Sequence, residues 1–165
     1  MSLLVHLTPA TNVRRILRSG IRMTRGGASR PAGVFAMPVT RNFYVSHQWL
    51  RELKRSGARS ISAVYFRVPD TEPILLGHYG RARVAMPASE AAAAISAASN
   101  AEGFELLVPR RIAAGEIHRV RELPQVLGWR YFPGAHGTKP CGCPACLPKG
   151  EMKSRAIRER YEKGG

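Results

Sequence analysis

Short apolar segments with strand-like composition recur along most of this chain, and their alternation with turns and helical patterns constrains the fold most. The segments are rich in β-branched and aromatic residues and are bounded by turn residues, as strands usually are. Because these strands are interleaved irregularly with helices, their order favours an α+β fold over a doubly wound parallel sheet. The predicted strands occupy residues 3–7, 33–37, 61–69, 73–79, 105–109 and 117–121.

Helical patterns lie between these strands. Val13, Ile16 and Leu17 fall on one face of a short predicted helix, which Gly20 ends. An amphipathic helix is predicted for 41–55 and an alanine-rich helix for 87–99. No stretch approaches the roughly 20 apolar residues of a membrane span, and the first residues lack the charged leader of a secretory signal. We therefore expect a cytoplasmic protein that does not enter a membrane.

The charge of the chain predicts a polyanionic partner. The 26 Lys and Arg residues outnumber the 11 Asp and Glu residues, which gives a formal net charge of +15. Of the 26 basic residues 21 are Arg, the side chain that forks onto phosphates and stacks on bases. Codon bias in a GC-rich genome is an alternative explanation of the Arg excess, although it does not explain the scarcity of acids. Nucleic acid is therefore favoured over a membrane surface.

The composition changes near residue 129, where Gly, Pro and Cys become frequent. We predict a core domain over 1–128 and a basic appendage over 129–165. All three cysteines lie close together in this appendage, and their odd number argues against a disulfide framework. Together with a nearby histidine they suit a structural zinc ion, while reduced thiols without metal are the alternative. The predicted ligands are His136, Cys141, Cys143 and Cys146, with His118 or a residue elsewhere as another candidate for the fourth position.

Segments of the core form an ordered pattern. The pattern begins with His-Leu-Thr at 6–8, followed by Ile-Leu at 16–17 and Gly-Ile at 20–21. Gly-Val-Phe-Ala-Met follows at 33–37, and Glu-Leu-Leu-Val opens a late apolar strand at 105–108. In this order the segments resemble the His-Tyr-Glu branch of the ADP-ribosyltransferase fold, typified by poly(ADP-ribose) polymerases and related to diphtheria toxin.

The resemblance implies a split, mixed or antiparallel β core with flanking helices, and NAD as a substrate. It implies that Glu105 stabilises the positive charge developing on the ribose, and that His6 hydrogen-bonds the adenosine-side ribose with support from Thr8. Leu7 stands in place of the family glycine, Phe35 in place of the tyrosine, and Gly103 removes the Glu-x-Glu pair of arginine-modifying relatives. The remaining residues implied to line the NAD cleft are Leu7, Phe35, Tyr44 and Ser46.

Without the resemblance, these residues have plainer interpretations. Glu105 would be a strand carboxylate paired with an arginine, and His6 and Phe35 would be core residues. With the resemblance, the charge points to ADP-ribosyl transfer to nucleic acid, with RNA favoured over DNA because the Arg-rich appendage carries aromatic residues able to stack on unpaired bases. Some relatives are toxins of bacterial conflict systems, which implies a toxin or defence effector and a neutralising antitoxin. A non-enzymatic zinc-knuckle nucleic-acid binder and an NAD-dependent RNA 2'-phosphotransferase remain alternatives.

Overall fold

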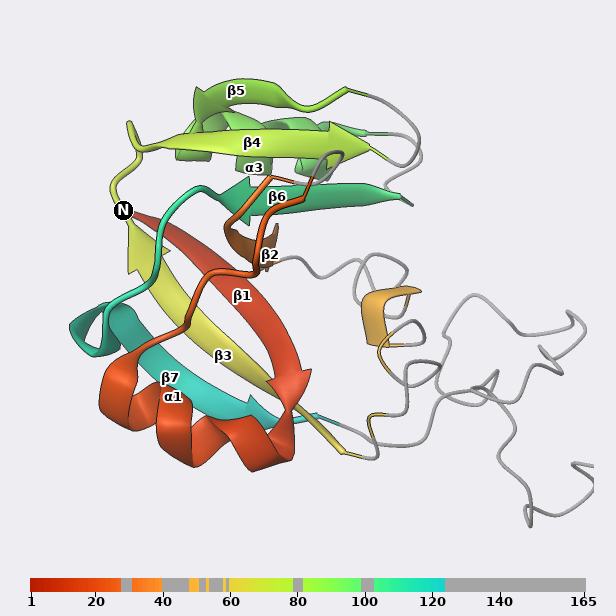
Figure 1. Ribbon diagram of the computed structural model, residues 1–165. Helices are drawn as coiled ribbons and strands as arrows, with labels where there is room; N and C mark the ends of the chain where they lie inside the picture. Colours follow the sequence, from red (N-terminus) through yellow and green to blue (C-terminus); the bar gives the residue numbers. More distant parts are fainter. Residues whose placement is uncertain are drawn as a thin grey trace, which may run out of the picture.

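The described part of the chain forms an antiparallel sheet in the order β5-β4-β6-β2-β1-β3-β7 (Figure 1). The structure is a computed structural model, and it describes residues 1–27, 31–39, 48–50, 53, 58, 60–78, 82–98 and 103–123. The α+β class predicted from the sequence is confirmed. The strands are β1 (Ser2–Pro9), β2 (Val34–Pro38), β3 (Ile61–Val68), β4 (Pro73–His78), β5 (Val84–Pro87), β6 (Phe104–Val108) and β7 (Ile117–Glu122).

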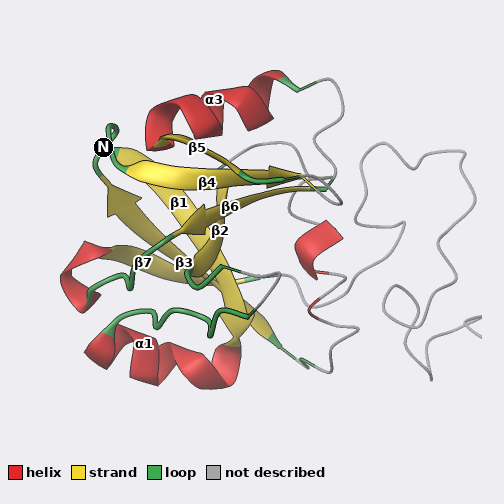
Figure 2. Cartoon of the chain, turned by 45° about the horizontal axis from the view of Figure 1, so that its top comes forward, coloured by secondary structure: helices red, strands yellow, loops and turns green. Residues whose placement is uncertain are grey.

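Helices cover the two ends of this sheet (Figure 2). The helix α3 (Ala88–Ala97) packs beside β4 and β5, and α1 (Val13–Ser19) lies near β7 at the other end. Short 3-10 turns, η1 (Ala10–Asn12) and η2 (Ala114–Glu116), precede α1 and β7. Ala88, Ala91 and Ile95 form the buried stripe of α3, and the small alanines let this helix approach the strands closely.

The end of α1 requires a glycine. Gly20 has a φ of 79°, a left-handed conformation that side chains with a Cβ rarely adopt. A Cβ at Gly20 would also lie 2.0 Å from the carbonyl oxygen of Ile112. Ile21 and Ile112 exchange backbone hydrogen bonds of 2.9 and 3.0 Å directly beside this contact. Gly20 therefore both ends the helix and admits the segment before η2.

The core lies between the sheet and its helices. Leu4, Val64, Phe66, Ile74 and Leu106 are fully buried in one continuous cluster drawn from both halves of the sheet. Truncation of a residue such as Phe66 to alanine would cost about 3–5 kcal/mol of folding free energy, because the vacated volume collapses only in part. This cluster fixes the strands that carry the candidate site.

The sheet has a short seam between β1 and β2. β1 pairs with β3 along its whole length, from Ser2 to Pro9. In contrast, β1 pairs with β2 only at Leu4 with Pro38 and at Val5 with Met37. β2 then continues its pairing with β6 instead. The two halves of the sheet therefore diverge directly after Val5, and the next residue of β1 is His6.

Most of the predicted core elements are confirmed. Each predicted strand is present, while β5 was not predicted because its four residues carry no alternating pattern. Residues 48–50 of the predicted amphipathic helix are helical, and most of its other residues lie outside the described part. The predicted appendage, 129–165, lies wholly outside it. Among the described residues, no helix has the length and apolar character needed to cross a bilayer.

Candidate active site

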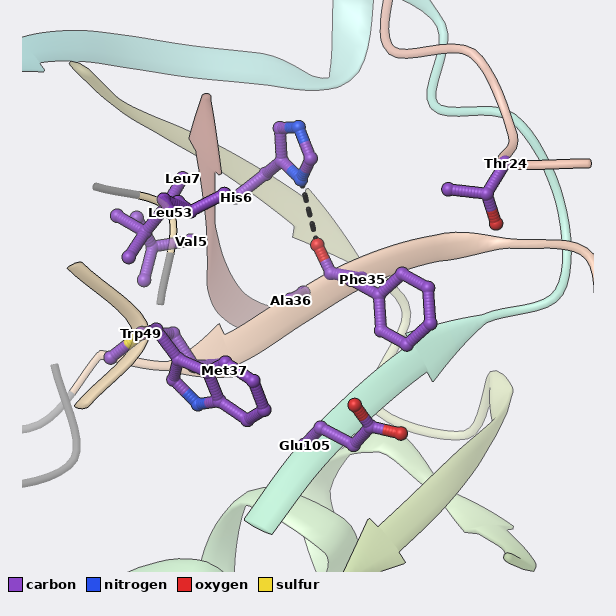
Figure 3. A pocket seen from close by; sticks show the side chains of 10 residues that line it. All are labelled: Val5, His6, Leu7, Thr24, Phe35, Ala36, Met37, Trp49, Leu53 and Glu105. Atoms are coloured by element: carbon purple, nitrogen blue, oxygen red, sulfur yellow. Dashed lines mark hydrogen bonds between the residues drawn. The ribbon is translucent and has the colours of Figure 1, made fainter. Parts of the chain in front are cut away.

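A cavity of about 350 Å³ lies where the two halves of the sheet diverge (Figure 3). It collects side chains from β1, β2 and β6, from the segment after α1, and from the helical residues around Trp49. Apolar and aromatic walls with a few polar groups are typical of small-molecule sites, and the volume lies in the lower part of their usual range. The lining residues are Val5, His6, Leu7, Thr24, Phe35, Ala36, Met37, Trp49, Leu53 and Glu105.

Phe35 and Glu105 reach the cavity from adjacent strands. Phe35 is directly opposite Leu107 in the β2–β6 ladder. Because side chains alternate along a strand, Glu105, two residues before Leu107, emerges on the same face as Phe35. In the view of Figure 3 the Phe35 ring lies between His6 and the Glu105 carboxylate. An aromatic ring and a carboxylate therefore reach the same cavity from adjacent strands.

His6 is held by the main chain of β2. The backbone oxygen of Phe35 lies 2.7 Å from His6 Nδ1, and since a carbonyl only accepts, Nδ1 carries the proton of this hydrogen bond. Burial lowers the pKa of His6 below its usual value, and the hydrogen bond to Phe35 opposes this shift in part. The ring is therefore neutral near pH 7, with Nε2 as a hydrogen-bond acceptor.

Glu105 is paired with Arg83, the residue before β5. Arg83 Nε donates a 3.1 Å hydrogen bond to Glu105 Oε1, and Arg83 Nη2 donates a shorter one to the same oxygen. The side chains are only 23% and 19% exposed, so the pair is largely shielded from water. The alternative interpretation of Glu105, a strand carboxylate paired with an arginine, therefore describes a contact that is present. Both hydrogen bonds go to Oε1, and Oε2 receives none from the described residues.

Gly77 makes room for this ion pair. Gly77 on β4 is directly opposite Glu105 on β6. A Cβ added to Gly77 would lie 3.1 Å from Glu105 Cγ and 3.2 Å from both Arg83 Cγ and Glu105 Oε1. Both side chains therefore pack over the bare backbone of Gly77, which lets Arg83 reach Glu105 from the far side of β4.

A short helical segment is anchored to the start of β6. Trp49 Nε1 donates a 3.2 Å hydrogen bond to the carbonyl oxygen of Phe104, the residue before Glu105. The backbone N–H of Gly103 donates a 2.7 Å hydrogen bond to Gln48 Oε1. These contacts hold the Trp49 indole as a wall of the cavity and fix the backbone that carries Glu105.

The other predicted site residues are placed as follows. Leu7 lines the cavity, whereas Thr8 is buried beside it, where its hydroxyl accepts a 3.1 Å hydrogen bond from Asn12. His118 is exposed on β7, and the described residues contain no cluster of His, Cys, Asp or Glu suited to a metal. The remaining predicted residues, Tyr44, Ser46, His136, Cys141, Cys143 and Cys146, lie outside the described part.

Several residues of the site were not predicted. Arg83 and Gly77 carry no signal in the sequence, because their role depends on how β4, β5 and β6 stack side by side. Trp49 had a weak signal, as an aromatic residue within the amphipathic pattern. Comparisons with models of protein families, with curated proteins and with solved structures found no significant match.

Proposed function

We propose that this protein is an NAD-dependent ADP-ribosyltransferase that modifies nucleic acid. The observation that carries the proposal is that His6, Phe35 and Glu105, from strands far apart in the sequence, line one cavity. These are the residues that the ordered motifs assign to the ribose hydroxyls, the nicotinamide ring and the reacting carbon. The motifs depend on the order of residues along the chain, so the convergence of these three residues on one cavity supports the proposal.

The proposed reaction breaks the bond between ribose C1 and the nicotinamide nitrogen. The bonding electrons leave with nicotinamide, and positive charge spreads over C1 and the ring oxygen, as in glycoside hydrolysis. A carboxylate held beside the ribose stabilises this charge, and the loss of one such preorganised group typically costs about 3 kcal/mol. Arg83 holds Oε1 of Glu105, which leaves Oε2 to accept a hydrogen bond from a ribose hydroxyl.

His6 and Phe35 supply binding and orientation. Neutral His6 presents Nε2 as an acceptor for a second ribose hydroxyl, because its Nδ1 proton is already donated to Phe35. The Phe35 ring offers an aromatic face on which the nicotinamide ring can stack. Leaving nicotinamide is replaced by an acceptor atom whose lone pair forms the new bond to C1, and the acceptor's proton passes to Glu105 or to water.

The charge of the chain favours nucleic acid as the acceptor. Phosphate contacts from Lys and Arg supply affinity without sequence preference, which suits a chain with a formal charge of +15. RNA remains favoured over DNA, because the Arg-rich appendage carries aromatic residues that can stack on unpaired bases. The zinc ion predicted for the appendage would order its basic residues without taking part in the reaction, since four protein ligands leave no open position.

The proposal is tested with labelled NAD and a single substitution. The full chain is incubated with NAD carrying label on the adenylate phosphate, in the presence of RNA, single-stranded DNA, duplex DNA or bulk protein. We expect label on nucleic acid and release of nicotinamide. Glu105→Gln should lower both by about 10²–10³-fold, as the removal of one preorganised electrostatic group does.

Glu90→Gln provides the matched control. Glu90 is exposed in the first turn of α3, and its substitution changes the net charge equally while leaving the cavity intact. Turnover by Glu105→Gln equal to that of the control would refute the proposal. Nucleic-acid binding without NAD turnover by the wild type would support the non-enzymatic alternative. Label on polypeptide alone would overturn the nucleic-acid acceptor and preserve the NAD chemistry.

A further inference from the structure

We infer that a surface tract on β3 and β7, formed by Tyr65, Arg67, Arg119 and Arg121, binds a single strand of nucleic acid and leads it to the cavity. The inference rests on the proposed function, since it names the route by which the acceptor reaches NAD. It arises from the register of the sheet, which connects the cavity to one edge of the molecule.

One cross-strand row links the cavity wall to the tract. Met37 on β2 is opposite Val5 on β1, Val5 is opposite Tyr65 on β3, and Tyr65 is opposite Arg119 on β7. Directly opposed residues share a face of the sheet. Met37 and Val5 line the cavity, so Tyr65 and Arg119 continue the same face outward to the edge strand.

The neighbouring rows bring further arginines to this face. Arg67, two residues after Tyr65, is opposite Leu3, and Arg121, two residues after Arg119, is opposite Ala63. Arg67, Arg119 and Arg121 are exposed, and none forms an ion pair with a carboxylate of the described residues. By contrast, Arg83 and Arg110, which do form ion pairs with carboxylates of the described residues, are partly buried.

Tyr65 and Arg119 form a preorganised pair at the centre of the tract. The guanidinium carbon of Arg119 lies 4.5 Å from the centre of the Tyr65 ring. This position of the guanidinium over the ring is a cation–π contact, and it restrains the Arg119 side chain beside Tyr65. Aromatic rings beside cations are the usual elements of single-strand binding grooves, where bases stack and phosphates pair with Arg or Lys.

A single strand fits the site better than a duplex. The cavity is recessed between β1 and β2, so the attacking atom of a base must enter it, and a base within a duplex is stacked and paired. A strand that crosses the tract could place one unpaired nucleotide at the cavity while its phosphates contact the arginines. A plainer role for these arginines is to stop the edge strand β7 from pairing with other chains.

The test compares two triple substitutions that remove the same charge. The tract variant, Arg67→Gln/Arg119→Gln/Arg121→Gln, removes the three positive charges of the tract. The control variant Arg14→Gln/Arg15→Gln/Arg18→Gln removes three exposed arginines from α1, which contributes no residue to the cavity. Affinity is measured by fluorescence anisotropy with a labelled oligonucleotide as RNA, as DNA of the same sequence, and as duplex.

The tract variant should bind either single strand much more weakly. Counterion release from single strands gives about fourfold in affinity for each phosphate contact at 0.15 M salt, so three contacts amount to about 50-fold. The slope of log affinity against log salt should become shallower by about 2. The control should lose far less, and duplex should bind the wild type more weakly than the single strands do. Comparison of the RNA and DNA oligonucleotides shows which of the two the tract binds more tightly.

Contrary outcomes are distinct. Equal losses in the two variants would show that only the overall charge attracts nucleic acid, and unchanged binding with new aggregation would show that the arginines only protect the edge. Either result would refute the inference that the tract binds a single strand. Nicotinamide release without any acceptor should be the same in the tract variant and the wild type. If the wild type releases none, the proposed function fails, while the anisotropy still decides whether the tract binds.

Discussion

The Arg83–Glu105 ion pair gives the sharpest prediction, because it separates a structural from a chemical role for the carboxylate. Arg83→Gln removes two charge-assisted hydrogen bonds and leaves a carboxylate that is only 19% exposed. Exposed pairs contribute at most about 1 kcal/mol, whereas loss of one partner of a fully buried pair costs about 3–5 kcal/mol. For this degree of burial we expect a loss of about 2 kcal/mol in the free energy of unfolding.

A double-mutant cycle measures the interaction itself. Glu105→Gln alone also leaves its partner unpaired, and the double variant loses no further contact. The sum of the single losses should therefore exceed the loss in the double variant by about 1–2 kcal/mol, measured by urea unfolding. Arg111→Gln, at an exposed arginine, is the control and should change stability by less than about 0.5 kcal/mol. Additive losses would refute the pairing in solution.

The same variants separate positioning from substrate binding. If Arg83 holds Glu105 for the reaction, Arg83→Gln lowers kcat for nicotinamide release and leaves KM for NAD nearly unchanged. Arg83→Lys, which retains a cation, should restore part of kcat. A rise in KM with an unchanged kcat would contradict this role, because it would show that Arg83 only binds NAD.

Further predictions concern the fold, pH, the space around Glu105 and the appendage. Gly20→Ala should lower the free energy of unfolding by about 3 kcal/mol, from the left-handed φ and the loss of the adjacent hydrogen bonds, and an unchanged urea midpoint would contradict the clash. Because the pKa of His6 is lowered in the folded state, its contribution to the free energy of unfolding is fully present above about pH 6.5. At lower pH the free energy of unfolding should fall by at most about 1.4 kcal/mol per pH unit, because the unfolded chain binds the proton more readily. Urea unfolding at several pH values measures this slope, which His6→Gln should remove. Gly77→Ala should displace Glu105 by a few tenths of an ångström, preserving the melting temperature while NAD turnover falls about tenfold; unchanged turnover would show that the carboxylate position is not critical. Elemental analysis should find zinc equimolar with the wild-type chain and absent from Cys143→Ser, and metal-free wild-type protein prepared with zinc present would refute the ligand prediction.

The strands and helices of the core were predictable because they depend on local patterns. Strand segments such as Ile61–Val68 are rich in β-branched and aromatic residues and are bounded by turn residues. Gly20 likewise indicates where the helix α1 ends. His6 and Glu105 were predictable as candidates because the motif order is local to each segment. Their shared cavity depends on the divergence of β1 from β2, which no local pattern encodes.

The residues that were missed act through strand pairing. Arg83 reaches Glu105 only because β5 and β6 flank β4 and because Gly77 has no side chain between them. Tyr65 and Arg119 stack only because β3 and β7 align in a particular register. Such relations join positions tens of residues apart, and a shift of one residue would send each side chain to the opposite face.

The seam between the halves of the sheet gives the cavity a thermal signature. Only the pairs Leu4 with Pro38 and Val5 with Met37 join β1 to β2. A molecule bound in the cavity would therefore contact both halves of the sheet and stabilise their association. A molecule bound to the folded chain alone raises its unfolding free energy by about 2.7 kcal/mol at a hundredfold excess over Kd. Melting curves recorded across a panel of dinucleotides would therefore identify the occupant before any product has been characterised.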